Sequence, residues 1–266
     1  MEEIKFKKFT FKKGLSTMLR VDFLRLSRSA LFYILLGVCF VIPILVTIMT
    51  TLMAGTTTTN PETNVTTTIE AFDSVWQVIG AKSDAPSSMD LTGMCNINLV
   101  YFVIAILVCL FVSDDFRSGY SKNLFTVRAS KLNYVISKTL ALSLAGILML
   151  LCFFVGAMIG GAISSLPFTL DGVNGFQLFM CILSKLLLAL VFVPIYLVVS
   201  VAVKQRTWLA VLLSLGAGML LFSMIPMITP LDSTILNPVL CLGGGAMLSV
   251  GLGAISNLIL KKTSLV

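Results

Sequence analysis

The sequence predicts an all-α polytopic membrane protein with six transmembrane helices. Of its 266 residues, 57% are hydrophobic and 12% are charged, and the mean hydropathy is +1.01. Soluble domains carry roughly 25% charged residues, so about half of the usual charge is missing. Six apolar runs are each long enough to cross about 30 Å of hydrocarbon as a helix. They cover residues 31–54, 94–112, 139–166, 176–203, 208–228 and 239–260.

Basic residues predict the orientation of these spans. Every Lys and Arg except Lys82 and Lys185 lies before span one, between spans two and three, between spans four and five, or after span six. With an even number of spans, these four segments share one side of the membrane, and the positive-inside rule assigns that side to the cytoplasm. The net charge of +7 belongs to this asymmetry, so we expect no nucleic-acid partner.

The spans then divide the chain into one membrane domain with two polar ends. Residues 1–30 are predicted to form a cytoplasmic N-terminus that contains an amphipathic helix. Residues 31–260 form the six-helix transmembrane domain, and residues 261–266 form a cytoplasmic tail. Within the membrane domain, residues 55–93 form a partly ordered extracellular loop, either a tether or a lid, and residues 113–138 form a cytoplasmic loop.

The composition argues against an enzyme. Histidine is absent, which removes the commonest general base and the commonest metal ligand. The six cysteines are scattered singly, and we interpret them as apolar fillers of helix interfaces rather than as a metal or disulfide framework. No phosphate-binding loop of the form G-x-x-x-x-G-K-[ST] occurs. We therefore predict no catalytic residue, no metal and no cofactor in this chain.

An amphipathic helix is expected before span one, along the inner leaflet. Its polar face is interrupted by Leu24, and its apolar face contains Asp22, an acid that does not belong in lipid. We expect Asp22 to pair with Arg25 or with the next cytoplasmic loop, or else to remain at the interface. The apolar face consists of Leu15, Met18, Leu19, Phe23 and Leu26.

The loop at 113–138 is too varied in character for a simple spacer. It contains two acids at the predicted membrane exit, then a Gly, then apolar residues among polar ones: Asp114, Asp115, Gly119, Leu124, Phe125 and Val127. Those apolar side chains would be exposed unless another protein covers them. We expect a short helix that docks onto a soluble partner and passes its motion to spans two and three. The alternative is a loop that folds back on its own bundle.

This loop resembles the cytoplasmic loop of ABC-2-type exporter permeases. The pattern in that family is an acid, a Gly, a triplet similar to Lys-Asn-Leu, a Ser-Lys/Arg pair and a closing Lys. Here these are Asp115 (where Glu is commoner), Gly119, Lys122-Asn123-Leu124, Ser130-Lys131 and Lys138. The stretch 19–33, with Asp22-Phe23, Arg25-Leu26 and Arg28-Ser29, is similar to the family's entry into span one.

The resemblance implies a permease subunit that is powered by a separate cytoplasmic ATPase, which binds the ATP and Mg. The amphipathic helix would be the connecting helix, and the loop would contain the coupling helix that contacts the ATPase. The resemblance also implies a second permease copy or a paralogous permease, in a homodimer or a heterodimer. The residues expected to couple to the ATPase are Asp115, Gly119, Lys122, Asn123, Leu124, Phe125 and Arg128.

The chain at 226–238 contains three prolines, Pro226, Pro230 and Pro238, within an apolar stretch. Proline breaks a helix, and non-helical backbone at membrane depth must be covered by protein or line a cavity. The family has a short re-entrant hairpin on the outer side at this position. A plain outer loop is the alternative.

Lys185 and the span glycines each have two interpretations. If span four begins at Phe176, Lys185 lies near mid-membrane and is a candidate pathway residue. If the span begins near Ser184, Lys185 extends to the outer surface. The run from Phe176 is longer than one crossing needs, which favours the start near Ser184. Gly156 and Gly160 form a GxxxG pair, and span six is rich in glycine. Such residues indicate close packing within the bundle or, alternatively, a dimer interface.

The leading functional hypothesis is the permease of an ATP-driven exporter in a bacterial plasma membrane. A pathway lined by Met, Phe, Leu and small residues suits a hydrophobic or amphipathic cargo such as an antimicrobial peptide, a drug or a lipid-like molecule. Similarity to peptide-export and bacteriocin-immunity permeases favours a Gram-positive host. The alternative is an ion-coupled secondary carrier or a channel, and the lack of acids inside the spans argues against proton coupling.

Overall fold

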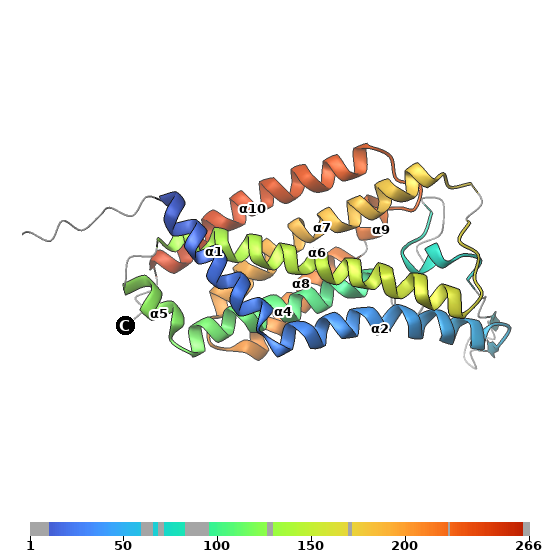
Figure 1. Ribbon diagram of the computed structural model, residues 1–266, viewed down its shortest axis with the longest axis horizontal. Helices are drawn as coiled ribbons and strands as arrows, with labels where there is room; N and C mark the ends of the chain where they lie inside the picture. The colour runs from blue at the N-terminus through green and yellow to red at the C-terminus, as the bar shows by residue number, and fades with distance from the viewer. Residues whose placement is uncertain are drawn as a thin grey trace, which may run out of the picture.

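The chain folds into an elongated helical bundle (Figure 1). The computed structural model describes residues 11–59, 66–68, 72–82, 96–126, 130–169, 172–222 and 224–262. Its long helices lie side by side, consistent with the predicted all-α class. The helices are α1 (Phe11–Ser27), α2 (Ala30–Met53), α4 (Asn98–Arg117), α5 (Tyr120–Thr126), α6 (Lys131–Ile163), α7 (Gly175–Val203), α8 (Thr207–Phe222), α9 (Met224–Ile228) and α10 (Leu236–Lys262).

Among the described residues, five helices are long and apolar enough to cross a membrane: α2, α4, α6, α7 and α10. The apolar run at 208–228, expected as one span, is divided between α8 and the five-residue α9. At 1.5 Å per residue, the 16 residues of α8 are about 24 Å long, which is less than the hydrocarbon core. The six-span count therefore stays a prediction, with α8 as the short member.

Helix α4 lies at the centre of the bundle and contacts α2, α6, α7 and α8. In its most apolar stretch 72% of residues are buried, against 17% in α10. A helix that is apolar on all sides is suited to this central position. The outer helices instead expose apolar side chains at helical spacing, as α2 does with Ile34, Val38, Val41 and Leu45. Those exposed rows are the surfaces expected to face lipid.

Helices α2 and α6 approach closely where α6 has glycines. A Cβ atom built on Gly156 would lie 2.2 Å from the carbonyl oxygen of Phe40, and one on Gly160 would lie 2.3 Å from Thr47 Oγ1. The GxxxG pair therefore serves packing within this chain, which is the first of its two interpretations. In α10, by contrast, a Cβ on Gly243 would meet nothing within 4 Å.

A proline organises the contact between α7 and α10. Pro194 has no N–H, so the carbonyl of Leu190 lacks its usual donor within the helix. Ser249 of α10 donates its hydroxyl to that carbonyl over 3.5 Å. Gly245 allows the close approach, because a Cβ there would lie 2.8 Å from Leu190 Cβ.

Both described ends of the chain, the start of α1 and the end of α10, lie at one end of the bundle together with α5 (Figure 1). We call this the α1 end. It contains most of the basic residues whose positions predicted the cytoplasmic side. Lys131 at the start of α6 donates to the carbonyl of Leu260 over 2.7 Å, which joins the beginning of α6 to the last turns of α10.

At the opposite end of the bundle, part of the long connection between α2 and α4 packs against the helices. The 3-10 helix η1 (Val75–Val78) is held there by backbone hydrogen bonds from Val75 to Pro167 and from Ile97 to Val78. Val75 and Val78 are almost fully buried. Two short strands of the Thr-rich tract, β1 (Thr57–Thr59) and β2 (Thr66–Thr68), pair antiparallel, which the sequence analysis did not predict.

The glycine contact gives a stability prediction. Gly156→Ala should lower the unfolding temperature of the detergent-purified protein, because its Cβ would collide with the backbone of α2. Overpacking of this kind typically costs about 1–3 kcal/mol. Gly243→Ala is the matched control and should leave the unfolding temperature unchanged or slightly raised, since Ala favours helix. Equal unfolding temperatures for the two variants would contradict the α2–α6 packing.

Candidate functional site

Four charged side chains from three helices meet inside the α1 end of the bundle. Asp22 and Arg25 are three residues apart on α1 and therefore lie on one face of that helix. Asp115 comes from the last turn of α4 and Lys138 from the third turn of α6. Asp22, Asp115 and Lys138 are at most 2% exposed. We call these four residues the charge cluster.

Lys138 lies at the centre of the cluster. Its Nζ is 2.7 Å from Asp22 Oδ1 and 2.7 Å from Asp115 Oδ2. The neighbouring Ser137 donates its hydroxyl to the other oxygen of Asp22 over 2.5 Å. A single ammonium group thus joins the acid of α1 to the acid of α4. This pairing confirms that Asp22 finds its partner in the predicted cytoplasmic loop rather than in Arg25.

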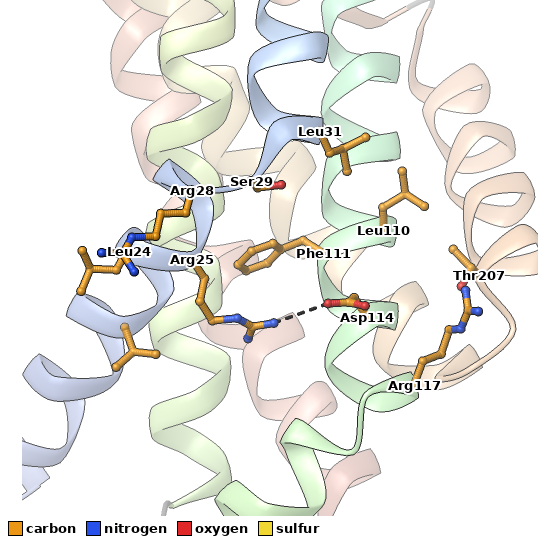
Figure 2. A pocket seen from close by; sticks show the side chains of 11 residues that line it. Leu24, Arg25, Arg28, Ser29, Leu31, Leu110, Phe111, Asp114, Arg117 and Thr207 are labelled. Carbon is orange, nitrogen blue, oxygen red and sulfur yellow. Dashed lines mark ion pairs between the residues drawn. The ribbon is translucent and has the colours of Figure 1, made fainter.

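Asp115 is the most heavily bonded member. Arg25 Nη1 lies 2.5 Å from its Oδ1, and the Tyr134 hydroxyl donates to its Oδ2 over 2.9 Å. Arg25 also reaches the exposed acid Asp114 at 3.6 Å, as the dashed line in Figure 2 marks. The sequence placed Asp115 at the membrane exit, but α4 continues to Arg117 and buries it. Its contacts are therefore with α1 and α6 rather than with the surface.

Aromatic rings complete the surroundings of the two cations. Lys138 Nζ lies 4.1 Å from the ring centroid of Phe111, and Arg25 Cζ lies 4.4 Å from that of Tyr120. At these distances a cation is attracted to the ring face. Burial, followed by the charge of Asp22, raises the pKa of Tyr120, so its hydroxyl stays neutral. Burial alone would lower the pKa of Arg25, but the charge of Asp115 raises it, and Arg25 stays a cation.

The charges of the cluster balance, with two carboxylates against two cations. Buried ions lose their hydration, and a buried pair is tolerated only when its geometry and hydrogen bonds are good. Removing one member leaves an uncompensated charge, which typically costs about 3–5 kcal/mol. The cluster therefore fixes the position of α1 against α4 and α6, and a displacement of any of the three helices must be shared by the others or break an ion pair.

Helix α5 follows the cluster directly and lies within the predicted coupling segment. Gly119 has a φ of 73°, a left-handed conformation that favours glycine and turns the chain between α4 and α5. Lys122 and Asn123 are exposed on α5. Arg128, the remaining basic residue predicted to couple, lies outside the described residues.

Leu124 and Phe125 differ from the expectation. They were predicted to be exposed, but both are half-buried and pack against the core of the chain. Phe125 makes an edge-to-face contact with Tyr134, with ring centroids 5.5 Å apart. Helix α5 thus folds back on its own bundle, since both side chains pack against its core. Its outward-facing residues are the polar ones. Val127, the third apolar residue expected to be exposed, lies outside the described residues.

Lys185 is remote from the cluster. It lies ten residues into α7, about 15 Å along the helix, and is 1% exposed. Its Nζ donates to Thr229 Oγ1 over 3.0 Å. The favoured expectation that Lys185 extends to the outer surface is wrong. Helix α7 begins after Asn174, whose backbone N–H donates to the side chain of Gln177, and not near Ser184. A role in the pathway stays a prediction.

The cysteines of the described segments are unpaired. Cys39, Cys109, Cys181 and Cys241 are buried, and Cys95 lies outside the described residues. Within the described segments, no three His, Cys, Asp or Glu side chains are grouped to hold a metal ion. Ser200 and Ser214 surround Cys109 with hydroxyl contacts at 3.3 and 3.2 Å, which is consistent with a packing role.

Long apolar helices with a basic, ion-paired end define a polytopic membrane protein. The family model described as "ABC-2 family transporter protein" matches residues 18–220. Because the match covers most of the chain, the chain belongs to this family and is the permease of an ABC transporter, as the loop resemblance predicted. The matched region includes all four residues of the charge cluster. A search of curated proteins found no match.

The charge cluster gives a prediction that a double-mutant cycle can test. Lys138→Met should destabilise the protein by about 3–5 kcal/mol, because Asp22 and Asp115 would then lack their shared cation. Adding Asp22→Asn to this variant should recover part of the loss, since one uncompensated charge disappears. Unfolding midpoints of the detergent-purified proteins provide the measurement.

Lys12→Met, which alters an exposed lysine of α1, is the control and should change stability by less than about 0.5 kcal/mol. Strictly additive effects of Lys138→Met and Asp22→Asn would show that the two side chains do not interact.

Proposed function

We propose that this chain is the transmembrane subunit of an ATP-driven exporter, coupled through α5 to a separate cytoplasmic ATPase. The observation that carries the proposal is the connection of α5 to the charge cluster. Helix α5 follows the last turn of α4 after a single tight turn, and its Tyr120 ring stacks on Arg25 of α1. A push on α5 would therefore reach α1, α4 and α6 together.

An ATPase partner is supported by family membership and by the sequence. The permeases of this family imply an associated ABC ATPase, and the chain itself carries no phosphate-binding loop. The ATP and Mg would be bound by that partner. The exposed Lys122 and Asn123 of α5 are suited to a polar contact with a soluble protein, with Arg128 following in sequence. A second permease copy or a paralogue would complete the transporter.

The basic α1 end supports a cytoplasmic location for both described chain ends. The membrane would be the plasma membrane of a bacterium, and the similarity to peptide-export permeases favours a Gram-positive host. The apolar interior suits a hydrophobic or amphipathic substrate, such as a peptide, a drug or a lipid-like molecule. Outward transport follows from the exporter permeases that the chain resembles.

Orientation can be tested by labelling single cysteines in intact cells with a membrane-impermeant maleimide. Asp73→Cys, at the η1 end, should react from outside, whereas Ser118→Cys, between α4 and α5, should react only after the cells are opened. Both positions are exposed in the fold, and the parent protein provides the background. Labelling of Ser118→Cys in intact cells would invert the proposed orientation and remove the ATPase contact with it.

Coupling can be tested by reversing the charge on α5. Lys122→Glu should weaken co-purification of the partner ABC ATPase several-fold and lower ATP-driven transport, because a charge at the rim of an interface changes binding. Lys261→Glu, an exposed lysine at the same end on α10, is the matched control and should behave as the parent. Phe125→Asp is less suitable, since it would also disturb the packing on Tyr134.

Normal transport and normal ATPase binding by Lys122→Glu would remove α5 as the contact. Transport that continues without ATP while an ion gradient is maintained would favour the carrier hypothesis instead.

A further inference from the structure

A buried lysine lies toward the end of the bundle opposite α1. Lys185 is 1% exposed, and its Nζ donates to Thr229 Oγ1 over 3.0 Å. That hydroxyl is a neutral acceptor, and it donates its own proton to the carbonyl of Ile225 over 2.8 Å. The ion pairs of the described residues all lie at the α1 end, and none of them includes Lys185. An ammonium group at this position has lost its hydration without gaining a carboxylate there, which is unfavourable.

Lys138 shows the contrast. It is as deeply buried as Lys185, but two carboxylates lie 2.7 Å from its Nζ. A lysine that serves only to hold helices together is expected to have such partners, and an apolar side chain of similar volume would fill the space of Lys185 at lower cost. The burial of Lys185 therefore opposes the arrangement of chain that buries it.

A thin layer of chain covers Lys185. Gly80 lies directly against it, since a Cβ built on Gly80 would be 3.5 Å from both Cε and Nζ of Lys185 and 3.8 Å from Leu231 Cγ. The next residue, Ala81, is exposed. Leu231 donates its backbone N–H to the carbonyl of Ala81 over 2.9 Å, which joins the two covering segments. We call residues 74–81 and 229–232 the outer closure.

The outer closure is attached to the connection between α6 and α7 and to α6 itself. Val75 donates its backbone N–H to the carbonyl of Pro167 over 3.2 Å, and Trp76 Nε1 donates to that of Phe168 over 2.7 Å. The Val75 side chain packs where a Cβ on Gly161 of α6 would collide with it. Figure 1 shows this segment in cyan, opposite the α1 end. Such loop contacts can separate while the long helices stay intact.

We propose that the outer closure is the outward gate of the transport pathway and that Lys185 promotes its opening. The proposal rests on the proposed exporter function and orientation. When the closure separates from α7, water reaches the ammonium group and restores its hydration, so the buried charge favours the open state. The hydrogen bond to Thr229 favours the closed state, because it satisfies one donor of the ammonium group there. The two side chains therefore act in opposite directions on one equilibrium.

The test is hydrogen–deuterium exchange of the full-length protein in lipid nanodiscs, followed by mass spectrometry of peptides that contain the amides of Val75 and Leu231. Both amides are hydrogen-bonded in the closed state. When closing is faster than exchange, their exchange rate is proportional to the open population. Lys185→Met should slow exchange about 10-fold, because no buried charge is left to hydrate. Thr229→Val should accelerate it about 10-fold, because the ammonium group loses its acceptor.

The opposite signs distinguish a gate from a merely structural hydrogen bond. If the bond only stabilised the fold, both variants would exchange faster than the parent, and that result would overturn the proposal, as would unchanged exchange in both. The double variant should behave as Lys185→Met does. Lys12→Met, which removes an exposed positive charge at the α1 end, is the matched control and should exchange as the parent. Should Lys185→Met not fold, Lys185→Gln removes the charge, keeps a donor and should also slow exchange.

A second arm separates the gate from the proposed function. Adding the partner ABC ATPase with ATP and Mg should accelerate exchange of the outer closure in the parent, and should do so less in Lys185→Met. Equal acceleration in the two proteins would overturn the role of Lys185. Unchanged exchange on addition of ATP would instead contradict the proposed coupling to an ATPase, and not the opposed action of Lys185 and Thr229.

Discussion

The fold depends on one ammonium group placed between two carboxylates. Lys138 joins Asp22 of α1 to Asp115 of α4, with a separation of 2.7 Å on each side. In a low-dielectric interior such a group is stable only if its counter-charges remain. The interfacial helix α1 is therefore a fixed part of the bundle rather than a mobile appendage, and the site proposed to receive force from an ATPase lies on the same framework.

Small residues and prolines determine how the remaining helices approach. Gly156 and Gly160 bring α6 against the backbone of α2, and Pro194 leaves a carbonyl of α7 for Ser249 of α10. These contacts need no hydrophobic driving force, which is weak between helices surrounded by lipid. Close packing thus joins α2 to α6 and α7 to α10, around α4 at the centre of the bundle. The charge cluster holds the helices together at the α1 end.

Much of this could be predicted from the sequence. The apolar runs gave the long helices because helical length and hydropathy are local properties, and Asp22 was recognisable as an acid in an apolar stripe. The loop was one of two partners expected for Asp22, but the particular residue, Lys138, was not predictable, since it depends on which turn of α6 faces α1. The choice between the two starts considered for span four could have been made, because Asn174 and Gln177 have the spacing of a capping box, which favours the earlier start. The burial of Phe125 depends on tertiary contact with Tyr134, which no local pattern contains.

The neutrality of the charge cluster has a consequence for voltage. An elementary charge that crosses the membrane potential gains or loses about 2.3 kcal/mol per 100 mV. Asp22, Arg25, Asp115 and Lys138 sum to zero, so the cluster itself carries no net charge through the field when these side chains shift along the membrane normal. A voltage dependence of such a shift would come from the other charges on these helices, such as Arg20, Asp114 and Lys131, and not from the cluster.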